Sequence, residues 1–112
     1  MELMQDESQD RLVCVQVTYA DAKLARQAAR DIVEQKLAAC VQQVRISSTY
    51  TWNGKVEEEA EHLLTAKTTM LRARDLEDFI RAGHPYDEPE FLVLPADAAS
   101  EGYARWVREI VV

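Results

Sequence analysis

The segment HPYDEP, residues 84–89, holds one of the chain's two histidines in a stiff stretch rich in carboxylates. His84 precedes Pro85 and Glu88 precedes Pro89, and a residue before proline is pushed toward extended backbone. A metal ligand, a general base and a structural corner would all look like this. As a ligand, the neutral imidazole of His84 would suit Cu(II) better than a hard cation. The alternative is a loop histidine bonded to a neighbouring backbone group.

Acidic and aromatic side chains accompany this histidine along the chain. Asp87, Glu88 and Glu90 could complete a metal site, although adjacent carboxylates on a surface loop are usually solvated. Tyr86 is a candidate anchor for the loop. Catalysis by His84 as a general base is the weakest hypothesis, because no nucleophile, oxyanion loop or cofactor motif accompanies it. We therefore expect that the protein is not an enzyme.

The second histidine and the two cysteines give weaker signals. His62 follows the acidic run EEEAEH, but in a strand it would face away from Glu59 and Glu61, which favours a solvated or interface histidine. Cys14 and Cys40 form no CxxC pair, so buried, reduced thiols are expected.

Length and composition limit the partners. Thirteen Lys and Arg stand against 20 Asp and Glu, a net charge of −7 that opposes nucleic acid or an anionic membrane as partner. No apolar run approaches the roughly 20 residues of a membrane helix, and the acidic N-terminus does not resemble a signal peptide. We expect a cytoplasmic protein with a disordered acidic tail (1–10) and a single domain (11–112).

Hydrophobic patterns divide the first half of the chain into alternating elements. The apolar run 11–19 predicts a buried strand, and Asp21 is a plausible N-cap for an amphipathic helix over 22–38. Apolar residues alternate with polar ones over 44–52, which predicts another strand. Asn53-Gly54 then predicts a hairpin, because both central positions of a type I′ turn require positive φ.

The segment after this turn has two readings. Lys55 to Ala82 contains no Gly or Pro, and its composition favours one long helix. A hairpin requires a partner strand, so we prefer a strand over 55–69 and a helix of about 71–82 that ends at Gly83. On such a strand one face carries Glu57, Glu59, Glu61, Leu63, Thr65 and Lys67. The other face carries Val56, Glu58, Ala60, His62, Leu64 and Ala66.

Two further elements complete the fold. FLVLP (91–95) predicts a final buried strand, and a C-terminal helix would share one face among Tyr103, Trp106, Val107, Ile110 and Val111. The order βαββαβ plus a tail helix is an α+β, ferredoxin-like arrangement. Helices on one face of an antiparallel sheet leave the other face needing cover, which self-association would supply.

Four motifs together resemble the CutA divalent-cation tolerance family. They are KLAAC (36–40), SSTYTWNGKVEEEAEHLLTAKTT (47–69), HPYDEPEFLVLP (84–95) and YARWV (103–107), which match in register. The resemblance implies a ferredoxin-like subunit in a PII-like homotrimer, and kinship of fold with PII signalling proteins. It also implies that the residues after the turn continue as a long strand.

The resemblance further implies a copper site of three ligands: a cysteine on the first strand, the histidine of HPY and a second histidine just before it. His84 matches one position, whereas Val17 and Gly83 stand at the other two. Cys14 lies three residues before Val17, so it faces the opposite side of a regular strand. Losing these ligands leaves carboxylates or water, and we expect weak binding of copper or another divalent cation.

The long hairpin and the family match place five residues in an inter-subunit cleft or interface. Aromatic residues near the tip of an over-long hairpin need a neighbour to cover them, and the lysine of the family's KT motif could hold an anion or carboxylate. We therefore predict a trimeric divalent metal ion tolerance protein. The alternative, by analogy of fold, is a PII-like sensor that binds a small effector in that cleft. The cleft or interface residues are Tyr50, Trp52, Lys67, Tyr86 and Glu90.

Overall fold

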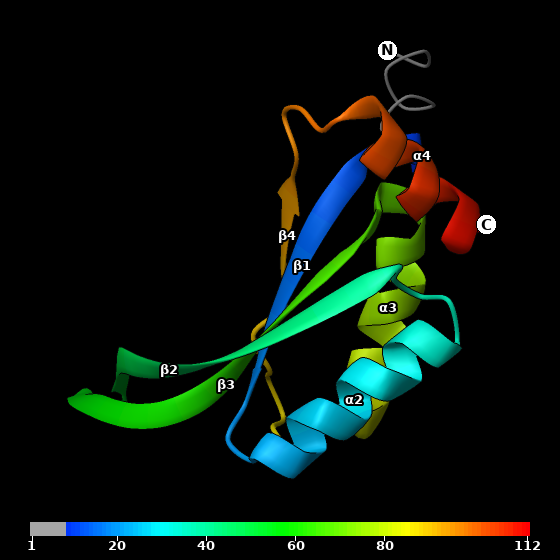
Figure 1. Ribbon diagram of the computed structural model, residues 1–112. Coiled ribbons are helices and arrows are strands. Elements are labelled where there is room, and N and C mark those ends of the chain that lie inside the picture. Colours follow the sequence, from blue (N-terminus) through cyan, green and yellow to red (C-terminus); the bar gives the residue numbers. More distant parts are fainter. Residues whose placement is uncertain (1–8) are drawn as a thin grey trace.

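The computed structural model of the chain describes residues 9–112 and shows a four-stranded antiparallel sheet with helices (Figure 1). The strand order is β2-β3-β1-β4. This confirms the predicted α+β class and the βαββαβ order with a tail helix. Of the predicted acidic tail, residues 1–8 lie outside the described part. The elements are β1 (Leu12–Tyr19), α2 (Ala22–Glu34), β2 (Cys40–Trp52), β3 (Lys55–Thr69), α3 (Met70–Gly83), β4 (Leu92–Pro95) and α4 (Glu101–Ile110).

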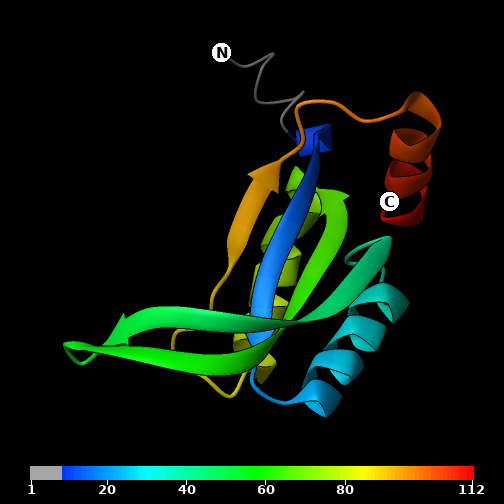
Figure 2. The same cartoon turned by 60° about the vertical axis from the view of Figure 1, so that its left-hand side comes forward.

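The core lies between one face of the sheet and helices α2 and α3 (Figures 1 and 2). Alternate residues of β1 and β3 point into it, as the strand period requires. Small residues such as Ala25 and Ala28 on α2 let this helix pack closely on the sheet. Burying each large aliphatic side chain contributes about 1.5–3 kcal/mol. The sheet residues in this core are Val13, Val15, Val17, Tyr19, Leu64 and Ala66.

The hairpin of β2 and β3 extends well past the rest of the sheet (Figure 2). Strand β1 pairs with β3 only from His62 to Thr69. Residues 46–61 therefore have only each other as strand neighbours in the described chain. We call residues 46–61 the arm and the remaining described residues the body. At its tip Asn53 and Gly54 have φ of 52° and 76°, which confirms the predicted turn.

Helix α2 begins at the predicted N-cap Asp21 but ends at Glu34, so the predicted end at residue 38 was wrong. Lys36 has a left-handed φ of 60°. The amides of Lys36 and Leu37 return to the carbonyls of Val33 and Ile32, both at 3.0 Å, in a Schellman motif. This motif turns the chain toward β2 earlier than the apolar pattern suggested.

Helix α3 ends without the glycine cap that the sequence predicts. Gly83 is the last helical residue and does not have the positive φ found at Gly54. His84 instead takes extended backbone, with φ −79° and ψ 138°. The physical reason is Pro85, which disfavours helical backbone in the residue before it.

The short strand β4 is not buried, contrary to the prediction for FLVLP. It lies at an edge of the sheet, where Val93 faces the helices and is half-buried. Leu92 and Leu94 point to the opposite face and are 51% and 44% exposed. We call this second face, which α2 and α3 do not cover, the open face. Being apolar was not enough to bury β4, because only one face of the sheet carries these helices.

Helix α4 packs at the end of the sheet where β1 begins (Figure 1). Its buried residues, among them Val107, lie against Leu12 and Ala39. Tyr103 and Trp106 are exposed, so the predicted apolar face was too wide. The reason is that the sheet end offers α4 a surface only as wide as its Ala104, Val107 and Val111 stripe.

Candidate functional site

His84 joins the end of α3 to the end of β1. Its Nε2 lies 2.7 Å from the carbonyl oxygen of Thr18, and the backbone amide of Tyr86 donates to its Nδ1 at 3.1 Å. The imidazole stacks on the buried ring of Tyr19, with centroids 4.3 Å apart and planes 24° apart. Tyr86 covers it from another side at 4.8 Å. The copper site implied by the family resemblance requires His84 near the first strand, and its bond to Thr18 shows that it lies beside β1.

These two bonds determine the tautomer of His84. The Tyr86 amide can only donate, so Nδ1 must be the unprotonated nitrogen. The Thr18 carbonyl can only accept, so Nε2 carries the hydrogen and donates it. A metal needs a free lone pair on the ring, and the single one available already accepts a hydrogen bond. A metal could bind this imidazole only by displacing the Tyr86 amide.

The residues at the family's other two ligand positions lie in different surroundings. Val17 is buried in the core on the helix-covered face. Gly83 is exposed, and a Cβ added there would meet no atom within 4 Å. Cys14 pairs with Lys67 of β3 on the open face and is half-buried. It thus faces away from Val17, as the odd offset predicts.

The carboxylates near His84 do not converge on it. Glu88 forms an ion pair of 3.3 Å with Arg81 on α3. Burial raises the pKa of Glu90, and the nearby charge of Glu61 on β3 raises it further. Within residues 9–112, no group of three His, Cys, Asp or Glu side chains is arranged to hold a metal ion. Glu90 and Glu61 are instead a pair of like charges beside the sheet.

The open face carries a polar row across three strands. Lys67 on β3 stands between Cys14 on β1 and Cys40 on β2, as their register shows. Its Nζ donates to Oε1 of Gln42 at 2.9 Å. Both cysteines are free and only half-buried, so the expectation of fully buried thiols was wrong. They are partly accessible because α2 and α3 lie on the other face.

The arm holds the two aromatic residues that the sequence places near the turn. Trp52 lies across from Lys55 and is 63% exposed in the single chain. The hydroxyl of Tyr50 hydrogen-bonds to Glu59 on the partner strand. This bond, with the negative charges of Glu59 and its neighbours on β3, raises the pKa of Tyr50 to about 12.

His62 lies at the base of the arm on the helix-covered side of β3. It pairs with Tyr19 of β1 and with Arg45 of β2. Because Glu59 and Glu61 point to the open face, His62 faces away from them, as predicted. It is half-buried.

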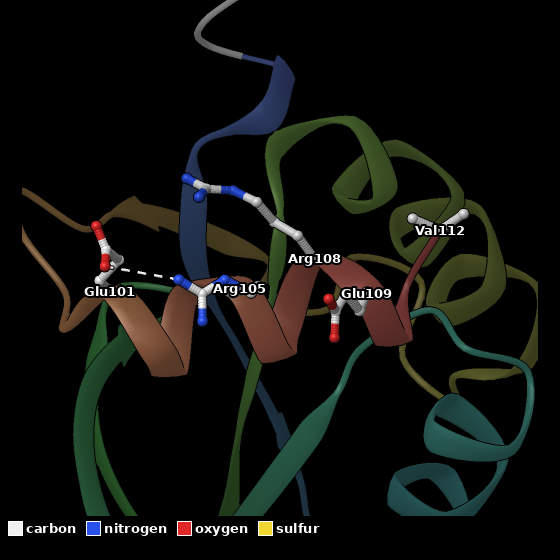
Figure 3. Close-up of a pocket in the computed structure, with 5 residues that line it drawn as sticks. All are labelled: Glu101, Arg105, Arg108, Glu109 and Val112. Atoms are coloured by element: carbon white, nitrogen blue, oxygen red, sulfur yellow. Dashed lines mark ion pairs between the residues drawn. The ribbon is translucent and has the colours of Figure 1, made fainter.

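A shallow hollow of about 260 Å³ lies on the outer surface of α4 (Figure 3). Its lining includes the ion pair of Arg105 with Glu101, at 3.5 Å. The hollow is at the end of the sheet where β1 begins, whereas His84 lies where β1 ends. It therefore does not belong to the His84 region. Its lining residues are Glu101, Arg105, Arg108, Glu109 and Val112.

The sequence did not predict which residues hydrogen-bond to His84 or to the C-terminal end of α2. The bond to Thr18 joins residues 66 positions apart, and no local pattern announces it. The guanidinium of Arg72 on α3 contacts the carbonyls of Gln35 and Lys36, the latter at 3.1 Å. The proposed anchor Tyr86 is exposed and packs on the His84 ring, whose bond to Thr18 attaches the loop to β1. The one signal for these contacts in the sequence was Tyr19, because it is the last residue of a strand whose alternate residues form the core.

Among residues 9–112, no helix is both long and apolar enough to cross a bilayer.

Comparisons with known proteins agree with this architecture. The family model described as CutA1 divalent ion tolerance protein matches residues 13–110. "Protein CutA" of Homo sapiens is 41% identical over 95 residues, covering 84% of this chain and 53% of the human protein. The chain spans about half the length of this protein and of the similar proteins of Mus musculus and Bos taurus.

Shorter relatives and solved structures match nearly end to end. The "Divalent-cation tolerance protein CutA" of Thermus thermophilus is 40% identical over 96 residues, covering 85% of this chain and 93% of that protein. A solved structure of the Thermus thermophilus protein superposes with a TM-score of 0.87 at 37% identity, covering 90% and 99% of the two chains. CutA1 of Oryza sativa gives 0.87 at 35% identity, covering 91% and 94%. The chain thus belongs to the CutA1 divalent ion tolerance protein family.

Proposed function

We propose that this chain is a homotrimeric divalent-cation tolerance protein that binds copper or another divalent cation weakly through His84. The observation that carries the assembly is the arm, residues 46–61, which no other strand within residues 9–112 flanks. The support for a role with metals is membership of a family named for divalent ion tolerance. We expect no catalytic activity.

Exposed apolar surface supports self-association. Leu92 and Leu94 on β4 and Val44 on β2 all point to the open face and are about half exposed. A large apolar patch on a folded chain usually marks an interface. Strand β2 is also an edge of the sheet over 13 residues, and an edge of this length is a template for pairing with another chain. Copies of the chain would cover both features.

The five residues predicted for the cleft or interface lie on compatible sides of the molecule. Tyr50, Trp52 and Lys67 are on the open face of β2 and β3. Glu90 and Tyr86 both feel the charge of Glu61, which points to the same face, so they lie beside it. We propose that all five contact a neighbouring subunit.

Weak rather than tight metal binding is what the surroundings of His84 support. The ring must give up the Tyr86 amide before its lone pair can reach a metal. Val17 offers no ligand atom, and Gly83 offers no side chain. Copper held by one imidazole and by carboxylate or water oxygen would be bound with little selectivity.

Sedimentation of the full chain tests the assembly. We expect a particle of about three chains at low micromolar protein concentration. A stable monomer under these conditions would contradict the proposal, because the arm would then be stable without a partner. A thermal-shift screen with divalent metals and with nucleotides tests the sensor alternative, since a ligand of the folded state raises the melting temperature.

Calorimetric titration with Cu(II) tests the metal site. The wild type should bind weakly, binding should disappear in His84→Ala and persist in the matched control His62→Ala, and it should fade as acid protonates the imidazole. Gly83→His adds a second imidazole at an exposed position with free space, and we expect it to tighten binding. Tight binding unchanged by His84→Ala would place the metal elsewhere.

A further inference from the structure

The charges of the open face are separated along β3. Every charged strand residue that points to this face belongs to β3, because the corresponding residues of β1, β2 and β4 are all uncharged. The cations are Lys67 in the body and Lys55 at the arm tip. We call the three glutamates between them, which all lie on the arm, the acid row: Glu57, Glu59 and Glu61.

Lys67 has no counter-ion near it in the described chain. Its row neighbours are the thiols of Cys14 and Cys40, and its one hydrogen-bond acceptor is the neutral Gln42. Apolar groups such as Leu94 flank the same row. Covering this face with another chain would remove water from the ammonium group, which is costly unless an anion replaces that water.

The acid row, in contrast, carries negative charges that lack sufficient cations within the described chain. Its carboxylates are spaced two residues apart on one face, so they repel one another. Glu59 receives the Tyr50 hydroxyl, but Glu61 forms no ion pair within residues 9–112 and lies near another acid, Glu90. Lys55 can offset one of these charges, which leaves a net negative arm.

Lys67 cannot neutralise the acid row of its own chain. Lys67 is six positions after Glu61 on β3, a distance of about 20 Å at roughly 3.4 Å per residue. That is well beyond the reach of a lysine side chain. A second copy can supply the missing partner, because each copy carries both the cation and the acid row.

We propose that Lys67 of one subunit docks against the acid row of a neighbouring subunit, with Glu61 as its principal partner. Glu61 is half-buried and is not held by Tyr50, which leaves its carboxylate available. The contact joins two different patches, so it fits a head-to-tail interface, and such an interface forms a ring of three when its rotation closes. The inference rests on the proposed homotrimer and names the charge pair by which one subunit recognises the next.

Charge reversal in the chain of residues 1–112 tests this pair. Lys67→Glu and Glu61→Lys should each raise the protein concentration at half-assembly by at least about 30-fold, as expected for a desolvated interface charge. The combined variant should recover at least about 10-fold of that loss. Lys67→Gln, which removes the positive charge but keeps a hydrogen-bond donor on a slightly shorter side chain, should weaken assembly in the same direction.

Matched controls separate this pair from a general charge effect. Lys23→Glu on α2 and Glu58→Lys on the opposite face of the arm make the same charge changes and should assemble like the wild type. Circular dichroism should show that every variant is folded. If the wild type is trimeric but the reversals match the controls, or the combined variant gains nothing, the pair is wrong and the trimer stands. A monomeric wild type would overturn both.

Discussion

The body and the arm share strand β3 but use it in opposite ways. In the body, alternate residues of β3 are buried, and Leu64 is only 1% exposed. In the arm, the same face of the same strand carries Val56, which is 74% exposed. The body has helices and a third strand to pack on, whereas the arm is a two-stranded ribbon. Such a ribbon is marginal in water by itself, and the proposed contacts between copies would stabilise the arm.

The aromatic residues repeat this contrast. Tyr19 closes β1 in the body, is buried and stacks on His84. Trp52 closes β2 in the arm and is mostly exposed. A tryptophan side chain carries a large apolar area, so leaving it in water forfeits much of the free energy that burial would contribute. The body therefore buries its aromatic residue through contacts within the chain, whereas Trp52 would be buried only by the proposed contacts between copies.

Trp52→Ala should give the largest effect. If copies bury Trp52, its loss should cost the assembled particle about 3–5 kcal/mol, and the trimer should dissociate or melt much earlier. Sedimentation and thermal melting measure this. Trp106→Ala on α4 is the matched control, because that indole is also exposed in the chain. A variant that stays trimeric and equally heat-resistant would mean that no neighbouring copy buries Trp52.

Leu64→Ala should destabilise the body by about 2–5 kcal/mol, because it leaves a cavity between the sheet and the helices. Urea unfolding at one fixed protein concentration measures the change. The paired substitution in the arm is Val56→Ala, on the same face of β3, which should cost less than about 0.5 kcal/mol if the residue stays on the surface. A large loss from Val56→Ala would mean that a neighbouring copy buries this face of the arm too.

His84→Ala should cost about 1–3 kcal/mol in metal-free buffer, because the Thr18 carbonyl and the Tyr86 amide both lose their partner. Thermal unfolding in the presence of a chelator measures this structural role separately from metal binding. His62→Ala is the control, since no hydrogen bond to its side chain joins it to the described residues. An unchanged melting temperature would mean that the HPYDEP segment is held without its histidine.

The titration of Tyr50 should give the smallest effect. Its pKa in the folded chain is about 12, above the ordinary value of 10.0, so the folded state holds a proton that the unfolded state releases first. The stabilisation is complete below pH 10 and is lost as the pH rises from 10 to 12. Ultraviolet titration should show one tyrosine that ionises at a higher pH than the others, and its pKa should move toward the ordinary value in Glu59→Gln. Identical titration curves for the two proteins would mean that Tyr50 and Glu59 do not form this hydrogen bond.

Local patterns in the sequence determined the order of elements and the faces of the strands. The alternation of residues 44–52, the Asn53-Gly54 turn and the two faces of β3 all depend on neighbours within a few positions. Such patterns are readable because strand period and turn geometry are local properties. After the turn, propensity favoured the wrong element, and the hairpin's need for a partner strand, supported by the resemblance to a family, favoured the strand.

Only the tertiary structure decided which apolar residues are buried and which lone pairs are free. Leu92 and Leu94 look like core residues in the sequence, yet they lie on the face that α2 and α3 do not cover. Helix α2 ends early at a left-handed lysine, Lys36, whose carbonyl accepts from the distant Arg72. His84 looks like an unhindered metal ligand in the sequence, and only the structure shows that both of its nitrogens already have hydrogen-bond partners. Burial and hydrogen-bond partners depend on residues far apart in the chain, and no local pattern records which of them will meet.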